Sequence, residues 1–311
     1  MRLAAIDVGT NTTRLLIAEE QGGSYRELDR RLIFTRLGEG VDSQKTLAPA
    51  AIKRTLAAIA EFCSVCGEFG VERLAVAGTS AVRDASNAHE FLQAAARLSG
   101  FPAVALSGDE EAQLSFVGAT GELATGDCLV IDIGGGSTEF VAGRPPLNIA
   151  GRISLDIGSV RLTERYCISD PPATEEILTM EAAIDDLLPR VDETMPVTST
   201  MLLVGLGGTV TTLAAISQGL EHYDSDLVDR STLRRESLDA LYRSLAGMTV
   251  AERRQIPLLP EGRADVIVAG AAILSRILAR WSFPEVLASE RDILDGLLLL
   301  LMGRLEKRRP G

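Results

Sequence analysis

The apolar positions of the chain follow two periods. Short apolar runs that end in Gly, Ser and Thr predict buried strands followed by tight turns. Longer stretches with an apolar residue every three or four positions predict amphipathic helices, and they cover residues 49–66, 87–98 and 175–191. Because strands and helices alternate along the chain, we expect an α/β protein with mixed sheets.

One strand–turn–strand pattern occurs twice. The stretch AIDVGTNTTRLLIA (5–18) aligns without a gap with VIDIGGGSTEFVAG (130–143). Asp7 then matches Asp132, and each copy predicts a β-hairpin with an aspartate at its mouth. A duplication between the two halves of a chain suggests two related domains. We expect these domains to face each other, with Asp7 and Asp132 pointing into one cleft.

The boundary between the domains is expected between Gly118 and Gly126, which gives an N-terminal domain of residues 1–120 and a C-terminal domain of residues 121–311. The segment after about Ser289 predicts a final helix that packs back on either domain. Its apolar run, LLLLLM, is far shorter than the roughly 20 residues that cross a bilayer, so a buried helix is expected.

Two further strands end in turns of small residues. In residues 71–87 a turn at Gly78-Thr79-Ser80 is followed by Arg83. In residues 201–215 a buried strand ends in GLGGT, and Thr209 is expected to start a helix. Together with the two hairpins, these turns predict several places where the backbone lies open to a ligand.

The composition limits the partners of the protein. It has 46% apolar and 24% charged residues and a formal net charge of −12, which is globular composition. An acidic protein binds nucleic acid and anionic membranes poorly, so neither is expected as a partner. An anionic substrate needs a metal ion or a local basic pocket. Four cysteines and an opening, MRLAAID, without a secretory leader predict a reduced, cytoplasmic setting.

Glycine-rich turns suit phosphate groups, because successive N–H groups can converge on phosphate oxygens with no Cβ in the way. A single such turn is equally consistent with a tight hairpin, but three in one chain favour a polyphosphate ligand. Asp7 and Asp132 beside these turns predict Mg²⁺, which prefers oxygen ligands, with Mn²⁺ as the alternative metal. The competing interpretation is that one of the two aspartates only caps its turn.

Hydrolysis of such a ligand would also need a base or a group that orients water. The only histidines, His89 and His222, do not lie beside a glycine turn, so a carboxylate is expected in this role. The candidates are Glu111, in the first turn of a helix predicted after Ser107-Gly108, and Glu139, directly after the GGGST turn. The nearest competitor is Glu110, although the helix dipole alone favours acidic residues at a helix start.

The stretches AIDVGTNTTRLLIA, GTSAVRDASN, SGDEEAQLSFVGA, VIDIGGGSTEFVAG and VGLGGTVTTLAA carry a resemblance. In sequence, order and spacing they resemble the exopolyphosphatase/guanosine pentaphosphate phosphohydrolase (Ppx/GppA) family, over essentially the whole chain. The resemblance implies two ribonuclease-H-like domains around a central cleft, as in actin and the acetate and sugar kinases. The length matches the short, two-domain form of the family, which implies an open site and a preference for shorter polyphosphate. Homodimers occur in the family.

The resemblance also assigns roles to individual residues. Glu111 matches the glutamate that activates the attacking water, Asp132 the Mg²⁺-associated aspartate and Glu139 a second functional carboxylate. One departure is Gln113, where the family commonly has arginine. The residues that match the phosphate-binding turns are Asp7, Thr10, Asn11, Arg83, Gly134, Gly135, Gly136, Ser137, Gly207, Gly208 and Thr209.

The function that the resemblance implies is an Mg²⁺-dependent exopolyphosphatase, which releases orthophosphate from the end of a polyphosphate chain. The alternative is the same chemistry on pppGpp, which would leave ppGpp, because both substrates present a terminal phosphoanhydride to the same turns. Two other hypotheses are a kinase of the wider superfamily and a sensor that binds polyphosphate without hydrolysing it. The acidic pair Glu110-Glu111 disfavours the kinase, and intact Glu111, Asp132 and Glu139 disfavour the sensor.

Overall fold

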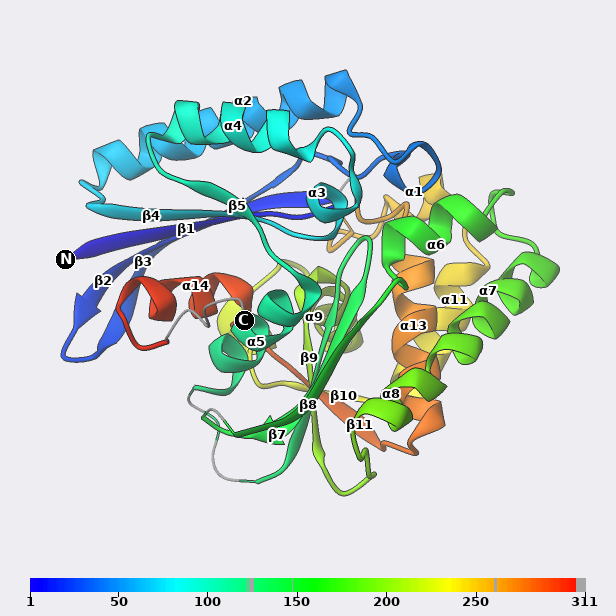
Figure 1. The fold of residues 1–311 in the computed structure, drawn as a ribbon. Helices are drawn as coiled ribbons and strands as arrows, with labels where there is room; N and C mark the ends of the chain where they lie inside the picture. Colours follow the sequence, from blue (N-terminus) through cyan, green and yellow to red (C-terminus); the bar gives the residue numbers. More distant parts are fainter. Residues whose placement is uncertain (122, 124–125, 147, 260–261, 306–311) are drawn as a thin grey trace. The chain divides into compact units, whose positions relative to one another are not determined.

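The chain folds into two compact units. A computed structural model describes residues 1–121, 123, 126–146, 148–259 and 262–305 (Figure 1). The first unit comprises Met1–Gly118 and Asp292–Gly311, and the second comprises Ala119–Arg291. The boundary expected at residue 120 assigns residues 121–311 to the C-terminal domain, with a final helix that packs back on either domain. In the structure residues 292–305 belong to the first unit.

The first unit is built on a mixed five-stranded sheet in the order β3-β2-β1-β4-β5. β1 pairs antiparallel with β2 and parallel with β4, β2 pairs antiparallel with β3, and β4 pairs parallel with β5. The strands are β1 (Arg2–Val8), β2 (Thr12–Gln21), β3 (Ser24–Phe34), β4 (Arg73–Gly78) and β5 (Ala103–Ala105).

Helices cover both faces of this sheet. Its helices among the described residues are α1 (Val41–Gln44), α2 (Pro49–Glu68), α3 (Ser80–Asp84), α4 (Ala88–Ser99), α5 (Gly108–Thr120) and α14 (Ile293–Leu301). α2 and α4 lie on one face, where Ile6 and Leu15 pack with Phe62 in a buried core (Figure 1). α14 lies on the other face, against β1, β2 and β4. Because side chains alternate along a strand, Asp7 and Arg14 point to the α14 face.

The second unit repeats this topology. Its six-stranded sheet has the order β10-β11-β9-β6-β7-β8, and the strands are β6 (Cys128–Ile133), β7 (Thr138–Arg144), β8 (Asn148–Leu155), β9 (Leu202–Leu206), β10 (Thr232–Arg234) and β11 (Glu285–Ala288). β8-β7-β6-β9-β11 reproduces β3-β2-β1-β4-β5 in order and in strand direction. Both units are therefore ribonuclease-H-like, and the duplication predicted from the hairpins is confirmed.

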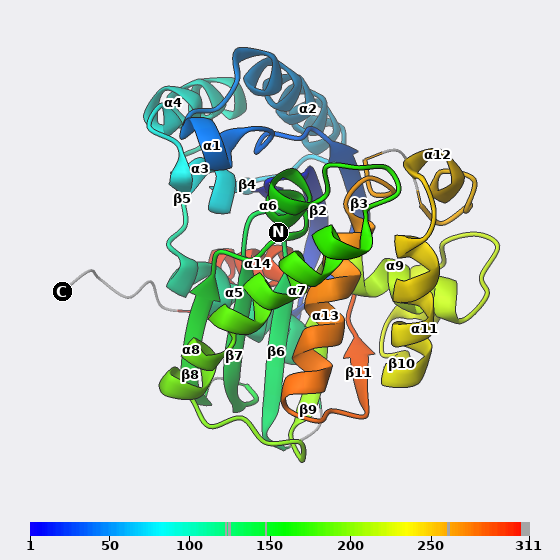
Figure 2. The ribbon, with the colours of Figure 1, turned by 90° about the vertical axis from the view of Figure 1, so that its right-hand side faces the viewer.

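The helices of the second unit enclose its main core. Among the described residues they are α6 (Ser159–Tyr166), α7 (Thr174–Leu187), α8 (Pro189–Thr194), α9 (Gly207–Ser217), α10 (Ser225–Val228), α11 (Arg235–Ala246), α12 (Val250–Arg253) and α13 (Ile267–Arg280). α7 and α13 lie over β6 and β9, as Figure 2 shows. Leu129, Ile131 and Phe140 of the sheet pack with Ile273 and Ile277 of α13 in this core.

Most of the predicted helices are confirmed, with local differences. The helices expected at 49–66 and 87–98 are α2 and α4, and the apolar segment near the C-terminus is the buried helix α14. The single helix expected at 175–191 is wrong: it breaks at Leu188 into α7 and α8, because Pro189 has no N–H to continue the ladder. No helix in the part of the chain that the structure describes is long and apolar enough to cross a membrane.

Candidate active site

The two duplicated turns have the same internal hydrogen bond. The Gly9 N–H donates to the Thr12 carbonyl at 2.9 Å, and the Gly134 N–H donates to the Ser137 carbonyl at 3.0 Å. A Cβ added at Gly9 or at Gly134 would lie 3.1 Å from that same carbonyl oxygen. Both turns are therefore tight, and in both the first glycine lies against the carbonyl group of the residue three positions later.

The carbonyl groups of the second turn are held by the start of α6. Residues 134–136 supply the acceptors and residues 158–161 pack against them. The bonds are Ser159 N–H to the Gly134 carbonyl at 2.9 Å, Val160 N–H to the Gly135 carbonyl at 2.8 Å, and Arg161 Nε to the Gly136 carbonyl at 2.6 Å. The packing requires a glycine at 158, since a Cβ there would lie 2.4 Å from the Gly135 carbonyl oxygen.

This arrangement fixes the direction of three N–H groups. In a trans peptide the N–H points opposite to the C=O of the same peptide unit, and the cis peptide bonds of the described chain lie elsewhere, at Pro145-Pro146 and Asp170-Pro171. With the carbonyls of residues 134–136 turned toward α6, the N–H groups of residues 135–137 point away from α6. Successive N–H groups aimed to one side form a concave surface for an anion.

The first turn uses the same arrangement with a different segment. The Thr10 carbonyl accepts from the Gly38 N–H at 2.9 Å. The Asn11 carbonyl accepts from the N–H groups of Thr35 and Arg36 at 3.1 and 2.9 Å. The N–H groups that follow these carbonyls consequently point to the opposite side. Gly38 has to be small here, because a Cβ on it would lie 2.2 Å from the Thr10 Cγ2 atom.

The third turn joins β9 to α9. α9 begins at Gly207, two residues before the expected start at Thr209. Gly207 has φ +81°, and a Cβ on it would lie 3.0 Å from Asp132 Oδ1, so this turn lies directly beside the aspartate one residue before the end of β6. Thr209 is buried and approaches α13 closely: a Cβ on Gly270 would lie 2.7 Å from Thr209 Oγ1.

Arg263 lies over the third turn and was not among the predicted site residues. A Cβ added at Gly208 would lie 2.1 Å from its Nη2 atom, and Arg263 Nη1 donates to Thr212 Oγ1 at 2.6 Å. The guanidinium can lie this close only because Gly208 has no side chain. It places a positive charge on a glycine turn of an acidic protein. No local pattern around residue 263 could have indicated this, because the contact joins segments far apart in the sequence.

Asp132 and Glu139 stand directly opposite each other on β6 and β7. Glu139 is 1% exposed, and its Oε1 atom accepts hydrogen bonds from the hydroxyls of Ser137 and Ser154, both at 2.7 Å. Ser154 occupies the next position in the same row, opposite Glu139 on β8. Residues in this relationship have Cβ atoms about 5 Å apart on one face of the sheet. Two carboxylates at that separation suit a divalent cation that they share.

The first hairpin has a different pair at the corresponding position. Asp7 stands opposite Arg14 on β1 and β2, and Arg14 Nε and Nη2 both donate to Asp7 Oδ2, at 3.0 and 2.6 Å. Asp7 Oδ1 is buried and has no hydrogen-bond partner among the described residues. Burial raises the pKa of Asp7, and the neighbouring Arg14 opposes that rise. Arg14 is therefore a cation that the protein itself supplies to this hairpin.

These carboxylates bear on the predicted metal. Within the described residues no group of three or more His, Cys, Asp and Glu side chains is placed to hold a metal ion. Mg²⁺ does not require such a group, since it commonly binds one or two carboxylates and completes its shell with waters and substrate phosphates. Asp132 and Glu139 fit that requirement as a pair, and Asp7 has one oxygen available as an acceptor.

Glu111 and Glu110 have different surroundings. Glu111 is 7% exposed, and its Oε2 atom accepts from Arg83 Nη1 at 2.9 Å, a nitrogen that also donates to the Leu106 carbonyl at 3.1 Å. Glu110 instead accepts from the N–H and hydroxyl of Ser107, both at 2.9 Å. Glu110 therefore caps α5, while Glu111 is held beside Arg83 in the first unit.

The remaining candidates for chemistry lie apart from these turns. His89 and His222 are both exposed. All four cysteines are free thiols, and Cys66 and Cys128 are buried, as expected for residues of the core. The predicted site residues are thus divided between the units. The first unit carries Asp7, Thr10, Asn11, Arg83 and Glu111, and the second carries Asp132, residues 134–137, Glu139 and residues 207–209.

The two ribonuclease-H-like units, each with glycine turns and an aspartate at the end of its first strand, define a class of α/β enzyme that acts on phosphate compounds. The model of the Ppx/GppA phosphatase family matches residues 16–305. Exopolyphosphatase 2 of Mycobacterium tuberculosis is 38% identical over 317 residues, which cover 97% of this chain and 99% of that protein. The chain therefore belongs to the Ppx/GppA family and is a phosphoanhydride hydrolase.

Solved structures agree with this assignment. The crystal structure of an exopolyphosphatase-like protein is 37% identical and has a TM-score of 0.91, covering 96% of this chain and 97% of the other. The Ppx/GppA family member of Aquifex aeolicus is 31% identical and has a TM-score of 0.83, covering 99% of both chains. The resemblance inferred from the five sequence stretches is confirmed over nearly the whole chain.

Proposed function

We propose that this protein is an exopolyphosphatase, which hydrolyses the terminal phosphoanhydride of inorganic polyphosphate and releases orthophosphate. The observation that carries the proposal is the row of N–H groups at residues 135–137, directed away from α6 by the hydrogen bonds of the preceding carbonyls. Such a row suits phosphate oxygens. The name of the M. tuberculosis relative supports polyphosphate as the substrate.

In this proposal Glu111 orients and activates the attacking water. A general base must lie within hydrogen-bond reach of the proton that it takes, and a buried glutamate held by one ion pair has a defined position. Arg83, bound to Glu111 at 2.9 Å, supplies positive charge beside the base. As negative charge spreads over the transferred phosphoryl group, Arg83 stabilises it.

The three turns and Arg263 bind the phosphates. Their N–H groups and the Ser and Thr hydroxyls donate to phosphate oxygens. Arg263 adds the positive charge that a protein with net charge −12 needs where it binds an anion. The guanidinium is well suited to this contact, because its planar fork matches two phosphate oxygens.

Mg²⁺ is the proposed cofactor, with Mn²⁺ as the alternative. Asp132 and Glu139 would hold it, and the hydroxyls of Ser137 and Ser154 fix the Glu139 carboxylate for that purpose. When bound, the cation neutralises charge on the phosphate oxygens. The protein contributes by holding the two carboxylates opposite each other on β6 and β7.

The test is orthophosphate release from short polyphosphate, long polyphosphate and pppGpp, each assayed with Mg²⁺, with Mn²⁺ and with EDTA. We expect release from polyphosphate that EDTA abolishes. Faster release from pppGpp would show that the protein is instead a pppGpp phosphohydrolase that uses the same site. Binding of polyphosphate without release, or phosphate transfer from ATP to an added acceptor, would contradict hydrolysis and favour a sensor or a kinase.

A further inference from the structure

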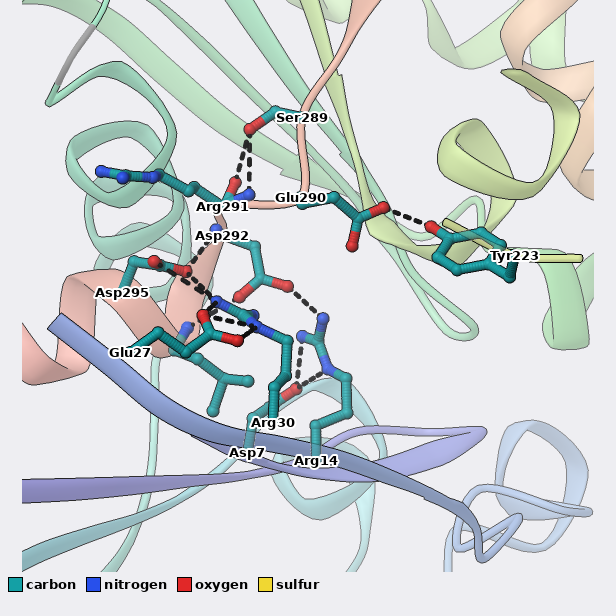
Figure 3. A network of polar contacts seen from close by, with 11 residues as sticks. Asp7, Arg14, Glu27, Arg30, Tyr223, Ser289, Glu290, Arg291, Asp292 and Asp295 are labelled. Carbon is teal, nitrogen blue, oxygen red and sulfur yellow. Dashed lines mark hydrogen bonds and ion pairs between the residues drawn. The ribbon is translucent and has the colours of Figure 1, made fainter. Parts of the chain in front are cut away.

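Asp292 connects the last helix to the first hairpin. It is 4% exposed, and its Oδ1 atom accepts from the Leu294 N–H at 2.9 Å, which caps the N-terminus of α14. Its Oδ2 atom accepts from Arg14 Nη1, as Figure 3 shows. The two oxygens of this carboxylate thus accept hydrogen bonds from two different elements of the first unit, α14 and β2.

The contact with Asp292 determines how Arg14 meets Asp7. A guanidinium commonly binds a carboxylate with two parallel hydrogen bonds, one to each oxygen. Here Arg14 Nη1 is taken by Asp292, and the remaining edge, Nε and Nη2, donates to a single oxygen of Asp7, Oδ2. Asp7 Oδ1 is left buried without a partner among the described residues. A buried acceptor in that condition is costly, so a partner supplied by a ligand is expected.

The position of Asp292 is itself fixed from two sides. Its N–H donates to Asp295 Oδ2 at 2.9 Å, and Arg30 binds Asp295 as well (Figure 3). The Tyr25 hydroxyl of β3 also donates to Asp295. α5 packs closely against the Asp292 backbone, since a Cβ on Gly118 would lie 1.9 Å from the Asp292 carbonyl oxygen. Asp292 cannot easily turn away from Arg14.

We propose that Asp292 is a positioning residue for phosphoanhydride hydrolysis. It acts through Arg14 and keeps Asp7 Oδ1 open as an acceptor for the hydrated cation that accompanies the phosphates. Without Asp292, Arg14 Nη1 loses this carboxylate, and the guanidinium can bind both oxygens of Asp7. The inference rests on the proposed function, because the cation and the phosphates belong to that proposal.

The experiment compares Asp292→Asn and Asp292→Ser with Asp295→Asn. Asn and Ser both cap helices well, so the first two variants keep α14 but remove the charged partner of Arg14. The third changes an equally buried aspartate of the same helix turn, and its amide oxygen can still accept from the Asp292 N–H, so Asp292 keeps its position. We expect kcat on tripolyphosphate to fall roughly tenfold to a hundredfold in both Asp292 variants, as for other groups that orient a ligand. KM should change little, and Asp295→Asn should keep kcat whatever its thermal stability.

Two further measurements separate positioning from a purely structural role. In a double-mutant cycle with Arg14→Gln, the second substitution should add almost nothing, because Asp292 acts through Arg14. Mn²⁺ titration followed by electron paramagnetic resonance should show weaker binding in Asp292→Asn and unchanged binding in Asp295→Asn. Unchanged kcat and Mn²⁺ affinity in Asp292→Asn, or an equal loss in Asp295→Asn, would overturn the inference. A wild-type protein that hydrolyses none of the substrates would instead overturn the proposed function. The Mn²⁺ titration would still test whether Asp292 affects cation binding.

Discussion

Arg14 and Glu139 occupy the same position in two copies of one hairpin. Arg14 stands opposite Asp7 across β1 and β2, and Glu139 stands opposite Asp132 across β6 and β7. The duplicated backbone thus presents an aspartate beside a cation in one unit and an aspartate beside a second carboxylate in the other. On this basis we expect Asp132 and Glu139 to bind a metal ion directly, whereas Asp7, already paired with Arg14, accepts only from water of a hydrated cation.

Replacement of Glu139 by Gln should weaken Mg²⁺ binding, because Asp132 would be left as the one carboxylate of the pair. The amide oxygen can still accept from the hydroxyls of Ser137 and Ser154, so we expect the free energy of unfolding to change little. The Mg²⁺ concentration that gives half-maximal hydrolysis should rise roughly tenfold or more. Ser154→Ala, which removes one of the two hydroxyl donors, should have a smaller effect. An unchanged Mg²⁺ dependence in Glu139→Gln would contradict the assignment of the metal to this pair.

Gly208→Ala tests the contact between the third turn and Arg263. The new methyl group would meet the far end of a flexible side chain, at 2.1 Å from Nη2, so Arg263 should move and the fold should survive. Loss of a charged hydrogen bond to the substrate should raise KM roughly tenfold. Gly67→Ala is the matched control, because a Cβ there meets no heavy atom within 4 Å. Equal KM values for the two variants would show that Arg263 does not bind phosphate.

Gly296→Ala tests how closely α14 approaches α5. A Cβ at this position would lie 2.2 Å from the Leu114 carbonyl oxygen, and backbone cannot move aside as a side-chain end can. We expect the variant to lose about 1–3 kcal/mol of unfolding free energy in urea, as for other overpacked sites. Gly67→Ala, within α2, should be neutral or slightly stabilising. A Gly296→Ala protein as stable as the wild type would contradict this packing.

Cys128 should make stability fall at alkaline pH. Burial, with a smaller contribution from Asp127, raises the pKa of its thiol from 9.0 to about 11. Below pH 9 the thiol is protonated in both states, so it has no influence. Between pH 9 and 11 the unfolded chain loses the proton first, which favours unfolding. Between pH 8 and 11 the free energy of unfolding, measured in urea, should therefore fall more steeply in the wild type than in Cys128→Ala. Parallel pH dependences of the two proteins would contradict the raised pKa of Cys128.

Much of the fold could be predicted because its signals are local. The two D-x-G hairpins lie within 14 residues each, and their matching sequences predicted the duplicated topology that the sheets display. The break between α7 and α8 was also available locally, in Pro189, but the helical period on both sides obscured it. Local turn chemistry likewise indicated which backbone segments would be open to phosphate.

The contacts that tune the site could not be predicted in the same way. Arg14 and Asp292 are 278 positions apart, and Arg263 reaches Gly208 from a different segment. Neither arginine differs in its local sequence from an exposed arginine. Their roles follow from the folded sheet and from glycines whose missing side chains leave room, so they became visible only in three dimensions.

The measurement that tests the central claim most directly is the Mg²⁺-dependent release of orthophosphate from tripolyphosphate by Glu111→Gln and Glu110→Gln. The two residues are neighbours in the first turn of α5, but Glu111 is bound to Arg83 whereas Glu110 caps the helix. Because an amide cannot take a proton from water, kcat in Glu111→Gln should fall by about 10²–10⁴, with Glu110→Gln close to the wild type. Full activity in Glu111→Gln, or equal loss in both variants, would contradict the account.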